Sequence, residues 1–241
     1  SYAGKQPAGV GPSDLIVLTE PRSPVAEAFR ALRTAILFST PAAPPKVILF
    51  TSASASEGKT QTSLNLATAL AESGARVLLI DVDLRRPSCH VRLGVENLRG
   101  LSNYLAGQAT LDEIIQTLAA PRLAFLPAGP PPPNPAELIG SQRMHEALTA
   151  LRAQYDFVIL DTPPVLPVTD TLLLARDTDG GVLVVKGHDT PRDLVRRARD
   201  TLVRARVPLL GVVVNNVDLG WGDLFFYHRY YGTYGHTAEA A

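Results

Sequence analysis

Residues 46–62 read KVILFTSASASEGKTQT, and this stretch decides the fold class. Its apolar run Val47–Phe50 predicts a buried strand, and the pattern from Thr60 to Glu72 predicts a helix. Between the two, Ala53–Thr60 matches the Walker A pattern, except that alanine replaces the first glycine. A strand, a glycine-containing loop and a helix in this order predict a P-loop, which holds the phosphates of a nucleotide.

The loop offers the groups that a nucleotide and its Mg²⁺ ion require. Consecutive backbone N–H groups surround the β-phosphate, and the helix that begins near Gly58 adds the positive end of its dipole. Lys59 is predicted to reach the β- and γ-phosphates, and Thr60 to ligate Mg²⁺. The predicted nucleotide-binding residues of this segment are Ser54, Ala55, Ser56, Glu57, Gly58, Lys59, Thr60 and Gln61.

Five further apolar runs continue the pattern along the chain, separated by helical patterns such as Arg192–Arg204. Because both faces of these runs are apolar, we expect strands buried between two helix layers. The predicted fold class is therefore α/β, with a doubly wound, mostly parallel sheet of the P-loop NTPase type and ligands at the carboxyl ends of the strands. The runs are Arg76–Ile80, Leu123–Leu126, Phe157–Leu160, Val182–Val185 and Leu209–Val214.

Length and composition describe an ordinary globular protein. The chain has 241 residues, of which 46% are hydrophobic and 19% charged, and its net charge is zero. This balance argues against a disordered chain and against a nucleic-acid partner. Cys89 is the only cysteine, which suits a reducing compartment, and no apolar run is long enough to span a bilayer. We therefore expect a cytoplasmic protein.

The sequence divides into three parts. Residues 1–22 are predicted to form a linker or arm, because their first part is rich in Gly, Pro, Ser and Ala. Residues 23–217 form the predicted P-loop domain, which begins with an amphipathic helix over residues 24–38 that places Val25 on its apolar stripe. Residues 218–241, which carry the tyrosines, are predicted to form a flexible C-terminal tail.

Three aspartates follow predicted strands. Asp81 and Asp83 come just after one apolar run, and Asp161 comes just after another. An isolated aspartate at a strand end is more often a helix cap or a turn residue. Beside a P-loop, however, carboxylates at neighbouring strand ends suit Mg²⁺, which they bind directly or through water. Asp161 is the best candidate for this Walker B role, and the other two supply a second acidic cluster.

These motifs together resemble a known family. The loop at Ala53–Thr60, the DxDxR element at Asp81–Arg85 and the DTPP element at Asp161–Pro164 are similar to Walker A, A′ and B of the bacterial tyrosine kinases of capsule and exopolysaccharide synthesis. The resemblance spans roughly residues 20–235 and includes SPVAEAFRALRT, LPAGPPPPNPAEL and the tyrosine-bearing end. It is specific, because several unrelated spacings agree at once.

The resemblance implies ATP as the phosphoryl donor, ADP as the product and Mg²⁺ as the metal. It implies that Lys59 and Thr60 bind ATP·Mg²⁺, that Asp81 and Asp161 help to hold the metal, and that Asp81 or Asp83 takes the tyrosine proton. A carboxylate there is useful, since a phenol with a pKa of about 10 is a poor nucleophile at neutral pH.

Two further residues, Arg85 and Asn215, each have two possible roles. Arg85 either steadies charge on the phosphoryl group or pairs with an aspartate. Asn215 resembles the adenine-contacting asparagine of related P-loop ATPases, or simply ends a strand in a turn.

The usual loop of the family resembles PGEGKS, whereas this chain has ASEGKT, so Ser56 must accept the backbone conformation of the cradle. We expect nucleotide binding to survive and the turnover rate to be the property at stake.

The C-terminal segment is rich in tyrosine. Taken alone, such a cluster indicates an aromatic packing or binding patch. In the family that the chain resembles, it is the target of autophosphorylation between subunits, and a mobile terminus can enter a neighbouring site. The candidate phosphorylation sites are Tyr227, Tyr230, Tyr231 and Tyr234.

Glu27, Arg30 and Arg33 form a charged ridge on the first predicted helix. Such a ridge is usually a solvated face. In the resembling family, an ExxRxxR motif at this place makes the subunit contacts of a ring, so the resemblance implies self-association, with an octamer as the expected form. It also implies a membrane-bound chain-length regulator, fused or separate, that keeps the kinase at the inner face of the cell membrane.

Two other functions compete with the kinase. ParA- and MinD-like ATPase switches have loops resembling KGGxGKT, and Ser54 stands here where they carry the first lysine. A catalytically silent ATP-binding scaffold for polysaccharide chain-length control has no distinguishing mark in the sequence, because a weak P-loop and an inactive one look alike.

Overall fold

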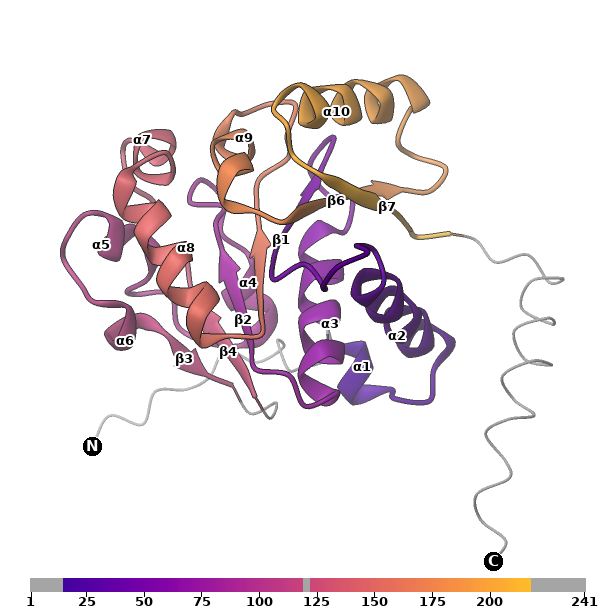
Figure 1. Cartoon of the computed structure of the whole chain (residues 1–241), viewed down its shortest axis with the longest axis horizontal. Coiled ribbons are helices and arrows are strands. Elements are labelled where there is room, and N and C mark those ends of the chain that lie inside the picture. The colour runs from indigo at the N-terminus through magenta and orange to yellow at the C-terminus, as the bar shows by residue number, and fades with distance from the viewer. Residues whose placement is uncertain (1–14, 119–121, 218–241) are drawn as a thin grey trace, which may run out of the picture.

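The computed structural model describes residues 15–118 and 122–217, which form a three-layered α/β fold (Figure 1). The seven strands of the described residues form one sheet in the order β3-β4-β2-β5-β1-β6-β7. Neighbouring strands are parallel except β3 and β4, which are antiparallel. The strands are β1 (Val47–Ser52), β2 (Val77–Asp81), β3 (Gln116–Thr117), β4 (Leu123–Leu126), β5 (Phe157–Asp161), β6 (Gly180–Lys186) and β7 (Leu209–Asn215).

All six predicted strands are present, so the predicted fold class is confirmed. The side chains of β1, β2 and β5 are buried on both faces, as expected for central strands between two helix layers. The prediction was wrong for β7, whose position at the edge of the sheet leaves Val212 and Val214 about half exposed, at 48% and 53%. The sequence analysis missed β3, since its two residues carry no apolar pattern.

Helices cover both faces of the sheet and create two hydrophobic cores. One core lies between the sheet and α3 (Lys59–Glu72), with α2 (Pro24–Leu37) packed against α3. The other lies beneath α8 (Gln142–Gln154) and α10 (Arg192–Arg204). The shorter helices are α1 (Ile16–Thr19), α4 (Cys89–Leu93), α5 (Leu101–Leu105), α6 (Leu111–Ile114), α7 (Pro135–Ile139), α9 (Asp170–Leu173) and the 3-10 turn η2 (Ala175–Asp177).

The N-terminal part differs from the prediction in two respects. Residues 15–22, assigned above to an arm, include α1, whose Val17 is buried and donates its N–H to Asn65 Oδ1 on α3 at 3.2 Å. This segment therefore packs on the domain. Helix α2 begins after Ser23, which caps it, but Val25 is 47% exposed and the helix instead buries Ala26 and Ile36.

Among residues 15–118 and 122–217, no helix combines the length and the apolar character needed to cross a membrane.

Candidate active site

The P-loop connects β1 to α3 at the carboxyl edge of the sheet. Two of its residues have left-handed backbone conformations, Ser56 with φ 63° and Gly58 with φ 89°. A Cβ atom at position 58 would lie 1.7 Å from Asn215 Nδ2, so only glycine fits there. Asn215 itself donates a hydrogen bond to the carbonyl of Glu57 at 3.2 Å. The strand-end asparagine is therefore part of the loop's support.

Lys59 and Thr60 point at the Walker B candidate Asp161. Lys59 Nζ lies 3.0 Å from Asp161 Oδ1, and the Thr60 hydroxyl donates to Asp161 Oδ2 at 2.8 Å. Burial is the largest single influence and works to lower the pKa of Lys59, but the combined attraction of its neighbours, Asp161 first among them, makes the net shift upward. The lysine thus stays a cation in a site where Asp161 is fully buried.

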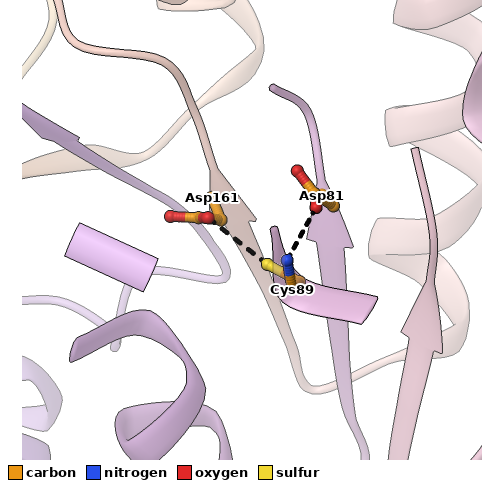
Figure 2. A group of neighbouring side chains, drawn as sticks. All are labelled: Asp81, Cys89 and Asp161. Carbon is orange, nitrogen blue, oxygen red and sulfur yellow. Dashed lines mark hydrogen bonds between the residues drawn. The ribbon is translucent and has the colours of Figure 1, made fainter. Parts of the chain in front are cut away.

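Asp81, Cys89 and Asp161 gather beside this pair, with Asp81 at the end of β2 and Asp161 at the end of β5 (Figure 2). The backbone N–H groups of Ser88 and Cys89 both donate to Asp81 Oδ2 at 3.0 Å, and the Cys89 thiol donates to Asp161 Oδ2 at 3.3 Å. Burial and, secondly, the charge of Asp161 raise the pKa of Asp81 to about 7. Two buried carboxylates that lie next to each other, as Asp81 and Asp161 do, repel each other and favour a cation between them.

The donor set fits Mg²⁺. Thr60, Asp81 and Asp161 supply the hard oxygen ligands that this ion prefers. Burial, followed by the charges of Asp81 and Asp161, raises the pKa of the Cys89 thiol well above its ordinary value. The thiol therefore keeps its proton at neutral pH and is not a magnesium ligand.

Asp83 and Arg85 lie farther along the same segment. Asp83 is buried and accepts the N–H of Arg86 on Oδ1 at 3.0 Å, and burial is the main reason why its pKa is raised. Arg85 makes a two-bond ion pair with Asp170, at 2.8 and 3.0 Å. Of the two roles considered for Arg85, the structure supports pairing with an aspartate, and the partner is one that the sequence analysis did not single out.

The structure thus brings together most of the predicted site. The four residues Lys59, Thr60, Asp81 and Asp161 meet at one edge of the sheet. Gln61, in the first turn of α3, accepts a hydrogen bond on its side-chain oxygen from the guanidinium of Arg92 at 2.9 Å. The tyrosines at 227, 230, 231 and 234 lie outside the described residues.

Sequence reasoning missed three supporting residues. Ser88 and Cys89 begin α4 and close over Asp81, and their place directly after the DxDxR element was the signal available for them. Thr190 follows β6 and donates its hydroxyl to Glu57 Oε1, and no motif marks it.

The charged ridge of α2, formed by Glu27, Arg30 and Arg33, makes most of its ion pairs and hydrogen bonds within the same chain. Glu27 pairs with Arg30, which also donates to the carbonyl of Pro21 at 2.8 Å. Arg33 donates to the carbonyl of Ala69 on α3 at 2.9 Å. At least one arginine of the predicted oligomer motif therefore fixes α2 to its own domain.

The fold and this arrangement of lysine, hydroxyl and carboxylates define a protein of the P-loop NTPase fold. In agreement, a family model described as an AAA domain matches residues 45–185.

Individual relatives show which family within the P-loop class the chain resembles. The tyrosine-protein kinase YwqD of Bacillus subtilis (strain 168) is 38% identical over 222 residues, which make up 92% of this chain and 91% of that protein. The kinase domain of the Escherichia coli tyrosine kinase ETK has a TM-score of 0.82 at 33% identity, covering 90% of this chain and 83% of that one. The chimerical protein CapA2B2 also has a TM-score of 0.82, at 37% identity over 85% of this chain and 90% of its own. The chain belongs to the family of bacterial tyrosine-protein kinases.

Proposed function

We propose that this chain transfers the γ-phosphoryl group of ATP to tyrosines of the C-terminal segment of a neighbouring copy, and so regulates the polymerisation and export of a capsule or exopolysaccharide. The observation that carries the proposal is the convergence of Lys59, Thr60, Asp81 and Asp161 at one edge of the sheet. Family membership supports tyrosine as the acceptor.

Each of these residues has a role in the proposed reaction. Thr60, Asp81 and Asp161 would hold Mg²⁺, which neutralises charge on the transferring phosphates when it is bound. Lys59 would exchange part of its pairing with Asp161 for the β- and γ-phosphate oxygens. The bond from the tyrosine oxygen to phosphorus forms as the bond to the leaving ADP breaks.

The tyrosine proton needs an acceptor, and Asp83 suits this role better than Asp81. Both oxygens of Asp81 already accept backbone N–H groups, from Asp83 on one side and from Ser88 and Cys89 on the other. Asp83 uses Oδ1 for the N–H of Arg86. Burial raises the pKa of Asp83, which makes it a stronger proton acceptor than an ordinary carboxylate.

The test is incubation of the purified protein with ATP·Mg²⁺, followed by mass spectrometry of the C-terminal peptide. We expect phosphate on one or more of Tyr227, Tyr230, Tyr231 and Tyr234. Mixing Lys59→Met with an active form that lacks the tail tests transfer between copies. An unmodified peptide, even with an activating partner present, would contradict the kinase and favour the ATP-binding scaffold.

We further propose that copies assemble into a ring through the outer side of α2, with Glu27 and Arg30 at the contact, and that a membrane-bound chain-length regulator activates the ring at the inner face of the membrane. Support comes from the exposed apolar residues near the two ends of α2, Val25 at 47% and Phe38 at 82%. Light scattering of the unaltered protein and of Phe38→Asp tests the contact. A monomer in both samples would contradict it.

A further inference from the structure

Glu57 places a buried carboxylate in the phosphate cradle, next to the predicted position of the phosphates. Only 4% of the residue is exposed. Its Oε2 accepts the backbone N–H of Ser54 at 3.0 Å, which closes a ring of four residues inside the loop. Its Oε1 accepts the hydroxyl of Thr190, which lies 133 residues away. The side chain therefore joins two parts of the chain.

The segments that Glu57 contacts are themselves fixed. Thr190 Oγ1 accepts the backbone N–H of Lys186, at the end of β6, at 3.0 Å. Asn215, at the end of β7, accepts the N–H of Gly187 at 2.7 Å and donates its side-chain amide to the Glu57 carbonyl at 3.2 Å. The side chain of Glu57 is thus linked through Thr190 to the carboxyl end of β6, and its backbone carbonyl is linked through Asn215 to the carboxyl end of β7.

The loop needs such support for a physical reason. Ser56 has φ 63°, a conformation that costs a residue with a Cβ atom on the order of 1 kcal/mol. A strained residue persists only where its surroundings hold it in place. The neighbouring Glu57 supplies that restraint, because its carboxylate accepts hydrogen bonds from Ser54 and Thr190 and its backbone carbonyl accepts one from Asn215.

We infer that Glu57 is a positioning residue, which keeps residues 54–58 in the phosphate-binding conformation through its hydrogen bonds to Ser54 and Thr190. The inference rests on the nucleotide site proposed above. Because the restraint acts before the nucleotide arrives, its loss weakens nucleotide binding and leaves phosphoryl transfer at saturating ATP nearly unchanged.

The experiment measures binding of a fluorescent ADP analogue with Mg²⁺, together with KM for ATP and kcat. Thr190→Val removes the hydroxyl and keeps the shape of the side chain, and we expect Kd and KM to rise about tenfold while kcat stays within about twofold. Thr190→Ser restores the hydroxyl and returns both constants to near the unaltered values. Glu57→Gln, which keeps the shape and removes one acceptor, shifts them in the same direction as Thr190→Val.

Thr201→Val is the matched control, because the Thr201 hydroxyl donates within α10, to the carbonyl of Arg197, and contacts no part of the loop. A merely structural role of Thr190 would lower the melting temperature of Thr190→Val without separating KM from kcat. Unchanged Kd in both Thr190→Val and Glu57→Gln, or a loss confined to kcat, would overturn the inference. Failure of the unaltered protein to bind the analogue would instead overturn the proposed nucleotide site.

Discussion

The P-loop edge of the sheet and helix α2 carry the two groups of charged residues in this chain that resemble family motifs, and they differ in how completely one copy satisfies them. At the P-loop edge, Lys59 and Thr60 of α3 contact Asp161 at the end of β5, and the two carboxylates Asp81 and Asp161 repel each other. On α2, Arg33 is used to dock the helix on α3. The close carboxylates of the first region fit the proposed nucleotide site, whereas the charges of the second are largely paired within the chain's own fold.

The two motifs differ in whether their charged groups are satisfied within one copy of the chain. Burial and, secondly, the charge of Asp161 raise the pKa of Asp81, and buried acids with a raised pKa are typical of sites whose charges a ligand or ion completes. A structural motif has its hydrogen bonds already satisfied. Substitutions in the first region should therefore affect binding and catalysis, whereas substitution of Arg33, which docks α2 on α3, should affect stability.

The largest expected effect comes from Lys59→Met. It removes the cation that pairs with Asp161 and faces the phosphates, so ATP-dependent tyrosine phosphorylation should fall by at least about 100-fold. Phosphate incorporation followed by mass spectrometry measures it. Lys46→Met, at an exposed position before β1, is the control and should retain full activity. Equal activity of the two variants would show that the P-loop edge is not the reactive region.

The next effect is the pH dependence of Mg²⁺ binding. Asp81 has a pKa of about 7 in the folded chain, above its value of about 4 in an unfolded chain. Between these values the folded state holds the extra proton, so the unfolding free energy of the nucleotide-free protein should fall as the pH rises from about 4 to 7. Magnesium displaces that proton, and its apparent affinity should rise about tenfold from pH 6 to pH 8.

Thermal unfolding with and without Mg²⁺·ADP, at pH 6 and pH 8, measures both effects. Asp81→Asn should flatten the pH dependence of the nucleotide-free protein. The assignment of the titration to Asp81 fails if this variant keeps the slope of the unaltered chain.

A smaller effect distinguishes two arginines of α2. Arg33→Ala removes the hydrogen bond to the carbonyl of Ala69 and should lower the free energy of unfolding by about 1 kcal/mol. Arg30→Ala removes a partly buried pair with Glu27 and a solvent-exposed hydrogen bond to the carbonyl of Pro21, and should change it by less than about 0.5 kcal/mol. Urea denaturation at a fixed protein concentration gives both values. The reverse order would mean that α2 is held mainly through its outer ridge.

The smallest effect concerns Ser56→Gly. Glycine adopts φ 63° without the steric cost, and part of this gain is offset by its greater freedom in the unfolded chain, so we expect stabilisation by about 0.5 kcal/mol. Arg206→Gly is the matched control, because Arg206 also has a left-handed conformation, with φ 60°, and lies just after the C-terminal end of α10. Denaturation should show similar gains for both variants, and only Ser56→Gly should alter the turnover rate. A change in turnover for Arg206→Gly would point to a general rather than a local effect.

Much of the fold was predictable because a buried parallel strand is a continuous apolar run. All six such runs became strands, and the strand-end aspartates fell at the site because carboxyl ends of parallel strands share one edge. The two polar residues of β3 pair through their backbone alone, so no side-chain pattern marks them. Helical spacing alone did not show which side of α2 faces α3, and Val25 was placed on the wrong side.

The supporting contacts of the site were beyond sequence reasoning for a different reason. Arg85 finds Asp170 across 85 residues and Glu57 finds Thr190 across 133. Such pairings depend on how neighbouring loops face each other after the sheet has formed. Local propensity and spacing do not contain that information.

The contact between Asn215 and the carbonyl of Glu57 spans 158 residues, from the P-loop that follows β1 to the end of β7. During synthesis the P-loop sequence leaves the ribosome long before this partner does, and long-range pairing closes late in folding. A growing chain that has not yet added β7 therefore has the complete Walker A sequence without its finished support. We expect tight nucleotide binding to arise only as the last described strand joins the sheet.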